Sequence, residues 1–243
     1  MQKVCIVIPC YNEARRLPGG DLLAFLASSP RADLCLVDDG STDATLERLR
    51  ELQAQHPDRI QIRALERNSG KAEAVRAGVL HVASSGRFPL IGYWDADLST
   101  PLEEVDHLLE ALTDNPRCVL ALGSRVKRLG STIERRAVRH VLGRLFAGCA
   151  SAVLGVAVYD SQCGAKIFRT EVVPTLFRDP FITRWLFDLE MLVRLRDQSG
   201  GAIAELTLEV PLRSWREVGG SKLKARDMIA VPLELLTIRH RYK

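Results

Sequence analysis

Two aspartates two residues apart, Asp95 and Asp97, are the side chains in this sequence best suited to chemistry. They follow the apolar stretch 88–94. In extended backbone, residues i and i+2 point to the same side, so both carboxylates could hold one divalent cation. Hard oxygen ligands suit Mg²⁺ or Mn²⁺, which can bind phosphates and neutralise the charge on a departing diphosphate. The alternative is an Asp-rich turn in which Ser99 or Thr100 caps the next helix.

Two further polar segments, Pro9–Glu13 and Asp38–Asp43, also follow apolar runs. If these runs are neighbouring parallel strands, carboxylates from three strands gather at one edge of the sheet. Such crowding is unfavourable unless cations or polar ligand groups occupy the edge, which favours a metal–nucleotide pocket. The structural alternatives are that Asn12 caps a helix beginning at Glu13 and that Ser41 or Thr42 caps the following helix.

The elements that position these segments alternate between short apolar runs and amphipathic helical patterns. This alternation predicts an α/β fold with right-handed crossovers and a mainly parallel sheet flanked by helices. Ligands on such sheets gather beyond the carboxyl ends of the strands, where the polar segments lie. The predicted strands are Val4–Pro9, Leu34–Val37, Ile60–Leu65, Pro89–Trp94 and Cys118–Gly123, and the predicted helices are Glu13–Ala27, Thr42–Gln55, Lys71–Ala83 and Leu102–Thr113.

The pattern changes in the second half of the chain, where longer helices dominate. We expect a helix that is first basic and then apolar at Glu134–Leu154 and an amphipathic terminal helix at Arg226–Tyr242. Between them we expect two strands, Gly164–Arg169 and Ala202–Val210, separated by a helix at Leu186–Arg196. No repeat or linker interrupts the sequence. We therefore expect a single domain over residues 1–243, with halves of about 1–125 and about 126–243.

Composition narrows the class of protein. With 243 residues, 47% hydrophobic and 26% charged, the chain is typical of a globular protein, and its net charge of +4 is too small to indicate nucleic-acid binding. Its six cysteines form no C-x-x-C pair, which argues against a zinc or thioredoxin-like centre and favours buried reduced thiols. No signal peptide or spanning helix is expected, which predicts a cytoplasmic protein.

Four motifs in order carry a family resemblance: Pro9-x-Tyr11-Asn12-Glu13, Asp38-Asp39-Gly40-Ser41-x-Asp43, Asn68-x-Gly70-Lys71 and Asp95-Ala96-Asp97. They resemble those of the inverting nucleotide-sugar glycosyltransferases of family 2, which have the A-type fold. The segments 160–166, 184–190 and 220–223 are similar to those of dolichyl-phosphate and prokaryotic polyprenyl-phosphate β-glucosyltransferases. The resemblance runs from about residue 4 to about residue 225. It implies a Rossmann-like sheet with acceptor-side helices in the C-terminal half.

The resemblance also implies roles for residues of the donor side. The nucleoside pocket would be lined by Pro9, Tyr11, Glu13 and Asp39, with Asp39 on the base or ribose. Asp95 and Asp97 would hold the metal and the diphosphate, Asp97 being the more direct ligand. The charge of Lys71, at a predicted helix start, would suit a phosphate or pair with the acidic cluster. A solvated first-turn lysine is the alternative.

Further roles follow on the acceptor side. Arg125 matches a position where arginine meets phosphate, for which its planar fork is suited. Lipid phosphate would meet the basic helix at Arg135, Arg136 and Arg139. The same half of the chain would also contact the donor, through Gln162 and through a loop bearing Arg216, Ser221 and Lys222. A solvated helix face and a flexible Gly-rich turn are the alternatives for these two segments.

Asp188 and Glu190 lie on a predicted helix. Residues i and i+2 diverge there by about 200°, so the two acids should not act as a pair. We expect one to face the acceptor pocket and the other an arginine or a helix terminus. Asp188 would serve as a general base or as a positioning residue. A phosphate acceptor is already anionic near neutral pH, which favours positioning.

The implied reaction is the transfer of glucose from UDP-glucose, with inversion, to a polyprenyl phosphate, using Mg²⁺ or Mn²⁺. Three alternatives stay open: GDP-mannose as donor, a soluble acceptor, and a non-catalytic nucleotide-sugar-binding protein. The basic segment that leads into Leu145–Val158, together with the basic C-terminus, fits peripheral contact with the inner face of a membrane. The same apolar stretch equally fits a protein core or a homodimer face.

Overall fold

The computed structural model describes residues 2–134, 137–218 and 225–242, with backbone only for 137–142 and 225–230. The chain folds into two compact units. Unit 1 comprises Met1–Leu98 and Ala165–Pro180, and unit 2 comprises Ser99–Gly164 and Phe181–Lys243.

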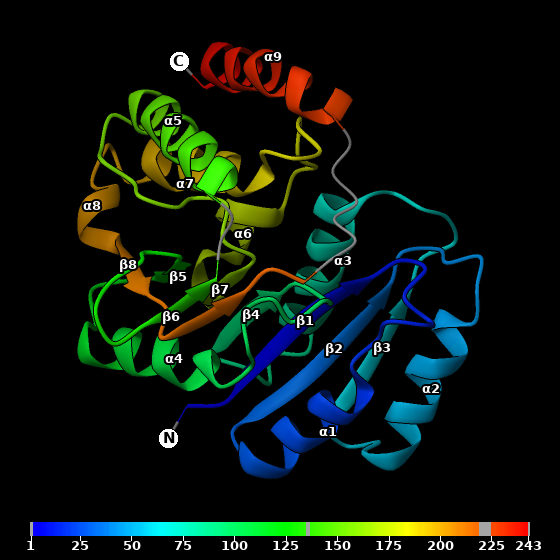
Figure 1. Ribbon diagram of the computed structural model, residues 1–243. Helices are drawn as coiled ribbons and strands as arrows, with labels where there is room; N and C mark the ends of the chain where they lie inside the picture. The colour runs from blue at the N-terminus through cyan, green and yellow to red at the C-terminus, as the bar shows by residue number, and fades with distance from the viewer. Residues whose placement is uncertain (1, 135–136, 219–224, 243) are drawn as a thin grey trace. The chain divides into compact units, whose positions relative to one another are not determined.

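Unit 1 is built around a five-stranded stretch of sheet in the order β3-β2-β1-β4-β7 (Figure 1). The strands β1, β2, β3 and β4 run parallel, and β7 is antiparallel to β4. Their bounds are β1 Val4–Cys10, β2 Ala32–Asp38, β3 Ile60–Ala64, β4 Leu90–Trp94 and β7 Ala165–Arg169. Because β2, β1 and β4 are neighbours and parallel, their carboxyl ends lie at one edge. The prediction of a mainly parallel α/β sheet is confirmed.

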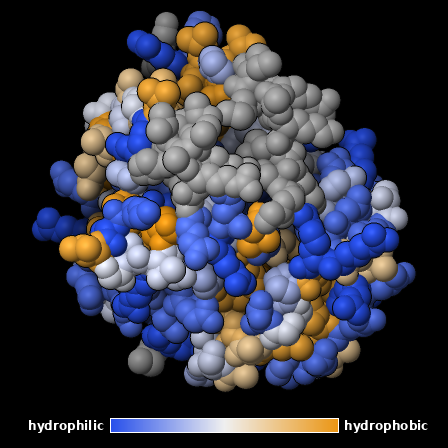
Figure 2. Space-filling view, in the orientation of Figure 1, coloured by the Kyte–Doolittle hydropathy of each residue, from blue (hydrophilic) through white to orange (hydrophobic). Residues whose placement is uncertain are grey.

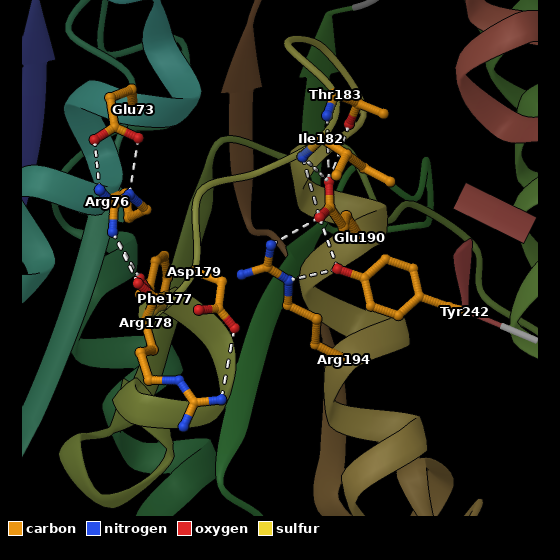
Figure 3. Close-up of polar contacts among 10 residues, drawn as sticks. All are labelled: Glu73, Arg76, Phe177, Arg178, Asp179, Ile182, Thr183, Glu190, Arg194 and Tyr242. Carbon is orange, nitrogen blue, oxygen red and sulfur yellow. Dashed lines mark hydrogen bonds and ion pairs between the residues drawn. The ribbon is translucent and has the colours of Figure 1, made fainter. Parts of the chain in front are cut away.

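Helix α3 packs closely against this sheet, and this packing fixes where its first residue, Lys71, lies. Gly78 lies so close to the sheet that a Cβ there would overlap the side chains of Val7 and Val37. Arg76 binds Glu73 and the backbone carbonyls of Phe177 and Arg178, which ties α3 to the segment after β7 (Figure 3). The helices of unit 1 are α1 Gly19–Ser28, α2 Thr45–Gln55, α3 Lys71–Ser84, the 3₁₀ turn η1 Thr170–Val172 and α6 Val173–Phe177.

Unit 2 combines two parallel strand pairs with a helical layer. Strand β5 pairs with β8, and β6 pairs with β9. Helix α5 packs against both α7 and α9. The strands are β5 Leu120–Ser124, β6 Thr132–Glu134, β8 Thr207–Pro211 and β9 Ser214–Arg216; the helices are α4 Glu104–Asp114, α5 Ala137–Leu154, α7 Phe187–Gln198, α8 Ile203–Leu206 and α9 Ala225–Arg241. In the described part of the chain, no helix has the length and apolar character needed to cross a bilayer.

Several predicted boundaries were wrong. The first helix begins at Gly19, because residues disfavour helical backbone immediately before a proline and Pro18 stands in the predicted span. The predicted strand Ala202–Val210 is divided: α8 occupies its first half and β8 begins only at Thr207. The long basic helix begins at Ala137 and is preceded by the short strand β6.

Candidate active site

The segment after β4 forms a tight turn. The backbone N–H of Leu98 donates to the carbonyl of Asp95 at 3.1 Å, and Leu98 has a positive φ of 46°. The expectation that Asp95 and Asp97 project from extended backbone was therefore wrong, and the turn geometry of the alternative holds. Neither Ser99 nor Thr100 caps the next helix, which begins at Glu104 without a side-chain cap. Asp97 is exposed and Asp95 half-buried.

Asp95 is paired with a lysine from the neighbouring helix. Lys71 Nζ lies 2.5 Å from Asp95 Oδ1, and each side chain is about one-third exposed. Lys71 is the first residue of α3, as predicted. Of the interpretations open for this residue, pairing with the acidic cluster is the one that the structure shows.

Asp39, at the end of β2, fixes the backbone that precedes Lys71. Its Oδ1 accepts from the N–H of Ser69 at 2.7 Å, and its Oδ2 accepts from the N–H of Gly70 at 2.9 Å. The carboxylate therefore lies at the N-terminus of α3, where negative charge is favourable. Gly40 makes this approach feasible: its φ is +62°, and a Cβ there would overlap the backbone of Arg67.

The ends of β1 and β2 are joined by hydrogen bonds between their loops. Asn12 accepts from the N–H of Thr42 at 2.9 Å, and its own N–H donates to Ser41 Oγ at 3.0 Å. Asn12 is therefore not a helix cap, and α2 begins only at Thr45, so the predicted caps Ser41 and Thr42 were also wrong. A hydrogen bond from the Thr45 hydroxyl lowers the pKa of Asp43 below its usual value.

Glu13 is fastened beside these loops by Arg16. The guanidinium Nε and Nη2 lie 3.0 and 2.9 Å from the two carboxylate oxygens, in the bidentate geometry that arginine favours. The N–H of Glu13 also donates to Thr45 Oγ1 at 2.8 Å. Pro9 lies in β1 and Tyr11 directly after it. The predicted nucleoside contacts of Pro9, Tyr11, Glu13 and Asp39 remain predictions.

The contacts of unit 1 connect the ends of β2 and β4 through α3, running from Asp39 to the loop at 69–70, then to Lys71 and to Asp95. Among the described residues, no group of three or more histidine, cysteine or acidic side chains is arranged to hold a metal. Two carboxylates are nevertheless enough for Mg²⁺, which is usually bound by one or two protein carboxylates together with substrate phosphates and waters. Asp95 and Asp97 are donors of the type that such a cation takes, and their role as its ligands remains a prediction.

In unit 2, Arg125 forms a bidentate ion pair with Asp160. Arg125 Nε and Nη2 lie 2.6 and 2.7 Å from Oδ2 and Oδ1, and the backbone N–H of Arg125 donates to Oδ2 at 3.1 Å. The Asp160 N–H in turn donates to Glu209 at 2.7 Å. A carboxylate held in this way is poorly suited to act as a general base. Near this pair in the sequence, Ser124 Oγ, Ser161 Oγ and Gln162 Nε2 are buried and without a hydrogen-bond partner in the described part of the chain.

Glu190 lies at the centre of a second network (Figure 3). It is fully buried and accepts from the N–H groups of Ile182 and Thr183, from Arg194 at 2.8 Å and from the Tyr242 hydroxyl at 2.9 Å. It is thus the acid that faces an arginine, as expected for one of the two. Asp188 is also buried, and its predicted role at the acceptor remains a prediction.

The network around Glu190 was not predicted from the sequence. The i,i+4 spacing of Glu190 and Arg194 on one helix was a usable signal for their pairing. The contribution of Tyr242, 52 residues from Glu190, carried no such signal. The pairing of Arg125 with Asp160 was missed for the same reason, since 35 residues separate them.

Several predicted residues fall where the structure gives no side-chain information. Arg135, Arg136, Ser221 and Lys222 lie outside the described residues, and the side chain of Arg139 is likewise not described. Arg216 ends β9, and its N–H donates to the carbonyl of Ser99 at 3.0 Å. Their predicted contacts with the donor or acceptor therefore remain predictions.

Comparison with known proteins defines the class. Residues 5–177 match the family described as Glycosyl transferase family 2, and the chain belongs to it. The chain is therefore a glycosyltransferase, as the motif order predicted.

Its similar relatives include several dolichyl-phosphate beta-glucosyltransferases. One from Trichomonas vaginalis is 33% identical over 247 residues, covering 96% of this chain and 69% of the relative. One from Saccharomyces cerevisiae is 32% identical over 261 residues, covering 98% and 74%, and one from Homo sapiens is 31% identical over 258 residues, covering 99% and 76%. The predicted kinship with this subgroup is confirmed.

Solved structures agree on the fold. The chain is similar to glucosyl-3-phosphoglycerate synthase from Mycobacterium tuberculosis in complex with Mn²⁺, UDP-glucose and phosphoglyceric acid, with a TM-score of 0.69 and 19% identity, covering 98% of this chain and 80% of that one. Mannosyl-3-phosphoglycerate synthase from Rubrobacter xylanophilus gives a TM-score of 0.70 at 17% identity, covering 99% and 73%. At these identities the likeness shows the fold alone, and it is the predicted one.

Proposed function

We propose that this glycosyltransferase moves glucose from UDP-glucose, with inversion, onto the phosphate of a polyprenyl lipid. The observation that carries the proposal is the Asp95–Asp97 turn beside Lys71 in a chain 31–33% identical to dolichyl-phosphate beta-glucosyltransferases. The two carboxylates and the ammonium group supply both kinds of charge that a metal-bound diphosphate requires. A non-catalytic nucleotide-sugar-binding protein would bind the donor in the same way but would transfer no sugar.

Asp95 and Asp97 would hold Mg²⁺ or Mn²⁺, which when bound would offset the negative charge that develops on the leaving diphosphate. Lys71 would add a second positive charge for the phosphates, held in place by the backbone that Asp39 fixes. Preorganised charge of this kind lowers the barrier because the protein need not reorganise during the reaction. Arg125 would meet phosphate, and the bidentate contact with Asp160 would hold its guanidinium in one orientation.

The attacking oxygen belongs to a phosphate monoester, which is largely ionised near neutral pH because its second pKa is about 6. It therefore needs no strong general base. This suits a chain in which Asp160 and Glu190 are both engaged by arginines. We assign Asp188 to positioning of the acceptor rather than to proton removal. We further propose peripheral contact with the inner face of a membrane, where such a lipid resides.

The direct test uses radiolabelled UDP-glucose with polyprenyl phosphate and Mn²⁺, followed by phase extraction. Label should enter the organic phase, and chelator should prevent it. Parallel reactions with GDP-mannose, and with 3-phosphoglycerate as a soluble acceptor, separate the alternatives. Label that stays in the aqueous phase with every lipid, but joins 3-phosphoglycerate, would refute the lipid assignment.

A further inference from the structure

Unit 2 carries an exposed apolar groove along α9. The groove has a volume of about 480 Å³ and is lined by Ile182, Leu233, Leu236, Thr237, His240 and Arg241. Its three aliphatic side chains are well exposed, at 43% for Ile182, 66% for Leu233 and 62% for Leu236. Figure 2 shows hydrophobic residues at the surface at the top of the view, where Figure 1 places α9. Exposed large aliphatic side chains gathered in one groove indicate an interaction surface.

Both walls of the groove are fixed by the same buried carboxylate. Glu190 accepts from the N–H of Ile182 on one wall at 3.0 Å and from the Tyr242 hydroxyl, just beyond α9, at 2.9 Å (Figure 3). Arg194 compensates the charge of Glu190 and also contacts the hydroxyl of Tyr242 at 3.0 Å. Because breaking a buried ion pair is costly, the two walls are held together. The exposure of the two leucines is therefore a consequence of the fixed packing of α9 against the loop at Ile182.

The charged side chains that line the groove are basic. The last turn of α9 carries Arg239, His240 and Arg241, and the six lining residues include no acid. One acid, Glu234, lies between the two leucines in the sequence; it accepts from the N–H of Leu186 at 3.2 Å and is thus engaged by the loop before α7. Apolar side chains flanked by arginines match an anionic bilayer, where the leucines enter the headgroup–acyl boundary and the arginines meet lipid phosphates.

We propose that this α9 groove is the surface by which the protein docks on an anionic membrane. The inference deepens the proposed function, since it rests on an acceptor that resides in a bilayer. A second copy of the chain fits less well. A symmetric dimer would bring the same basic residues together, with no acid lining the groove to offset them.

The test is co-sedimentation of the whole protein with vesicles. Wild type should bind phosphatidylcholine vesicles containing about 30% phosphatidylglycerol and should bind pure phosphatidylcholine much more weakly. The double variant Leu233→Ser/Leu236→Ser should reduce binding at least about tenfold, because apolar insertion is lost. Arg239→Gln/Arg241→Gln should reduce it about tenfold and remove its salt dependence. Leu129→Ser is the matched control, since Leu129 is fully exposed and outside the groove.

Thermal melts establish that each variant is folded. Equal binding to neutral and anionic vesicles, or an equal loss in Leu129→Ser, would overturn the proposal. The proposal would also be overturned if wild type bound no vesicles but formed a dimer in light scattering, and if the double leucine variant were monomeric. Transfer to detergent-solubilised acceptor should survive the leucine substitutions. If wild type binds vesicles as expected but transfers no glucose in detergent, the docking surface stands and the proposed function fails.

Discussion

Lys71 and Asp95 form an ion pair with 2.5 Å between Nζ and Oδ1, at the carboxylate that we assign to the metal. An ammonium group and a divalent cation compete for the same oxygen. Lys71 lies at the start of α3 on a long, flexible side chain. In the proposed mechanism its charge would move from Asp95 to a donor phosphate, and the pair would then link metal binding to donor binding.

Lys71→Met should therefore change two affinities in opposite directions. Mn²⁺ alone should bind about two- to fivefold more tightly, because the competing ammonium group is gone and a partly exposed ion pair contributes up to about 1 kcal/mol. UDP in the presence of Mn²⁺ should bind more weakly by a similar factor. Calorimetry measures both, with the exposed Lys3→Met as control. Changes of the same sign in both affinities would contradict the competition.

Asp97→Ala should abolish metal-dependent transfer while leaving the fold intact, because Asp97 is exposed on a turn. The expected loss is at least about a hundredfold, the scale for removal of a group that stabilises developing charge. Initial rates across a Mn²⁺ titration report the effect, and Asp114→Ala, another exposed aspartate, is the control. Wild-type rates in this variant, or in excess chelator, would exclude the assigned metal role.

Asp39→Asn should destabilise the loop that carries Lys71. An amide has one acceptor oxygen, so the N–H of Ser69 or Gly70 would face an NH₂ group instead of its present acceptor. Because these donors are only partly buried, the loss should be near the lower end of the cost of an unpaired donor, about 1 kcal/mol of unfolding free energy. Urea unfolding measures this, with the exposed Asp58→Asn for comparison. Unchanged stability together with lost UDP binding would instead mean that Asp39 contacts only the nucleoside.

The pair Arg125–Asp160 can be tested by a double-mutant cycle. Each single change to alanine should lower the unfolding free energy by about 2–4 kcal/mol, because it leaves a mostly buried charge without its partner. The double variant should lose less than the sum, with a coupling of about 1–3 kcal/mol. Strictly additive losses would show that the two side chains do not depend on each other.

The six cysteines should differ sharply in reactivity. Burial raises the pKa of Cys35 to about 12 and the pKa of Cys5 well above its usual value. Thiolates are the reactive form, so at pH 8 both should stay unmodified in the folded protein. Cys149 is exposed and should react alone with a disulfide reagent, the other five following only on unfolding. Rapid modification persisting in Cys149→Ser would contradict this assignment.

The order of strands and helices was predictable because each apolar run is bounded by a helical pattern of different period. The misplaced start of α1 shows where this fails: the chain makes a turn at 13–17, with the N–H of Leu17 donating to the carbonyl of Glu13 at 2.8 Å, but Pro18 disfavours helical backbone at the residue before it and α1 begins only at Gly19. Similarly, apolar character at 203–206 did not distinguish the short helix α8 from a strand. The periodicity of apolar residues identifies the buried face of a helix or strand but does not determine where that element begins or ends.

For the site, the motifs identified which residues matter, and the fold determined what they touch. Asp39, Lys71 and Asp95 were all singled out, yet their connection through the backbone at 69–70 depends on how close α3 lies to the sheet. The anchoring of Tyr242 on Glu190 joins distant segments that no local pattern connects. By contrast, the contact between Glu190 and Arg194 could be predicted from the sequence, because residues at i and i+4 of a helix are neighbours.

Gly40 limits how this protein can diversify. Its left-handed backbone and its close packing against Arg67 leave no room for a side chain. Position 40 therefore cannot accept a larger residue without a change in the conformation of the turn. Sequence variation in this loop is therefore expected at neighbours such as Ser41 and Thr42 rather than at Gly40. A saturation library across residues 38–43 should return glycine alone at position 40 among active clones, while several residues survive at 41 and 42.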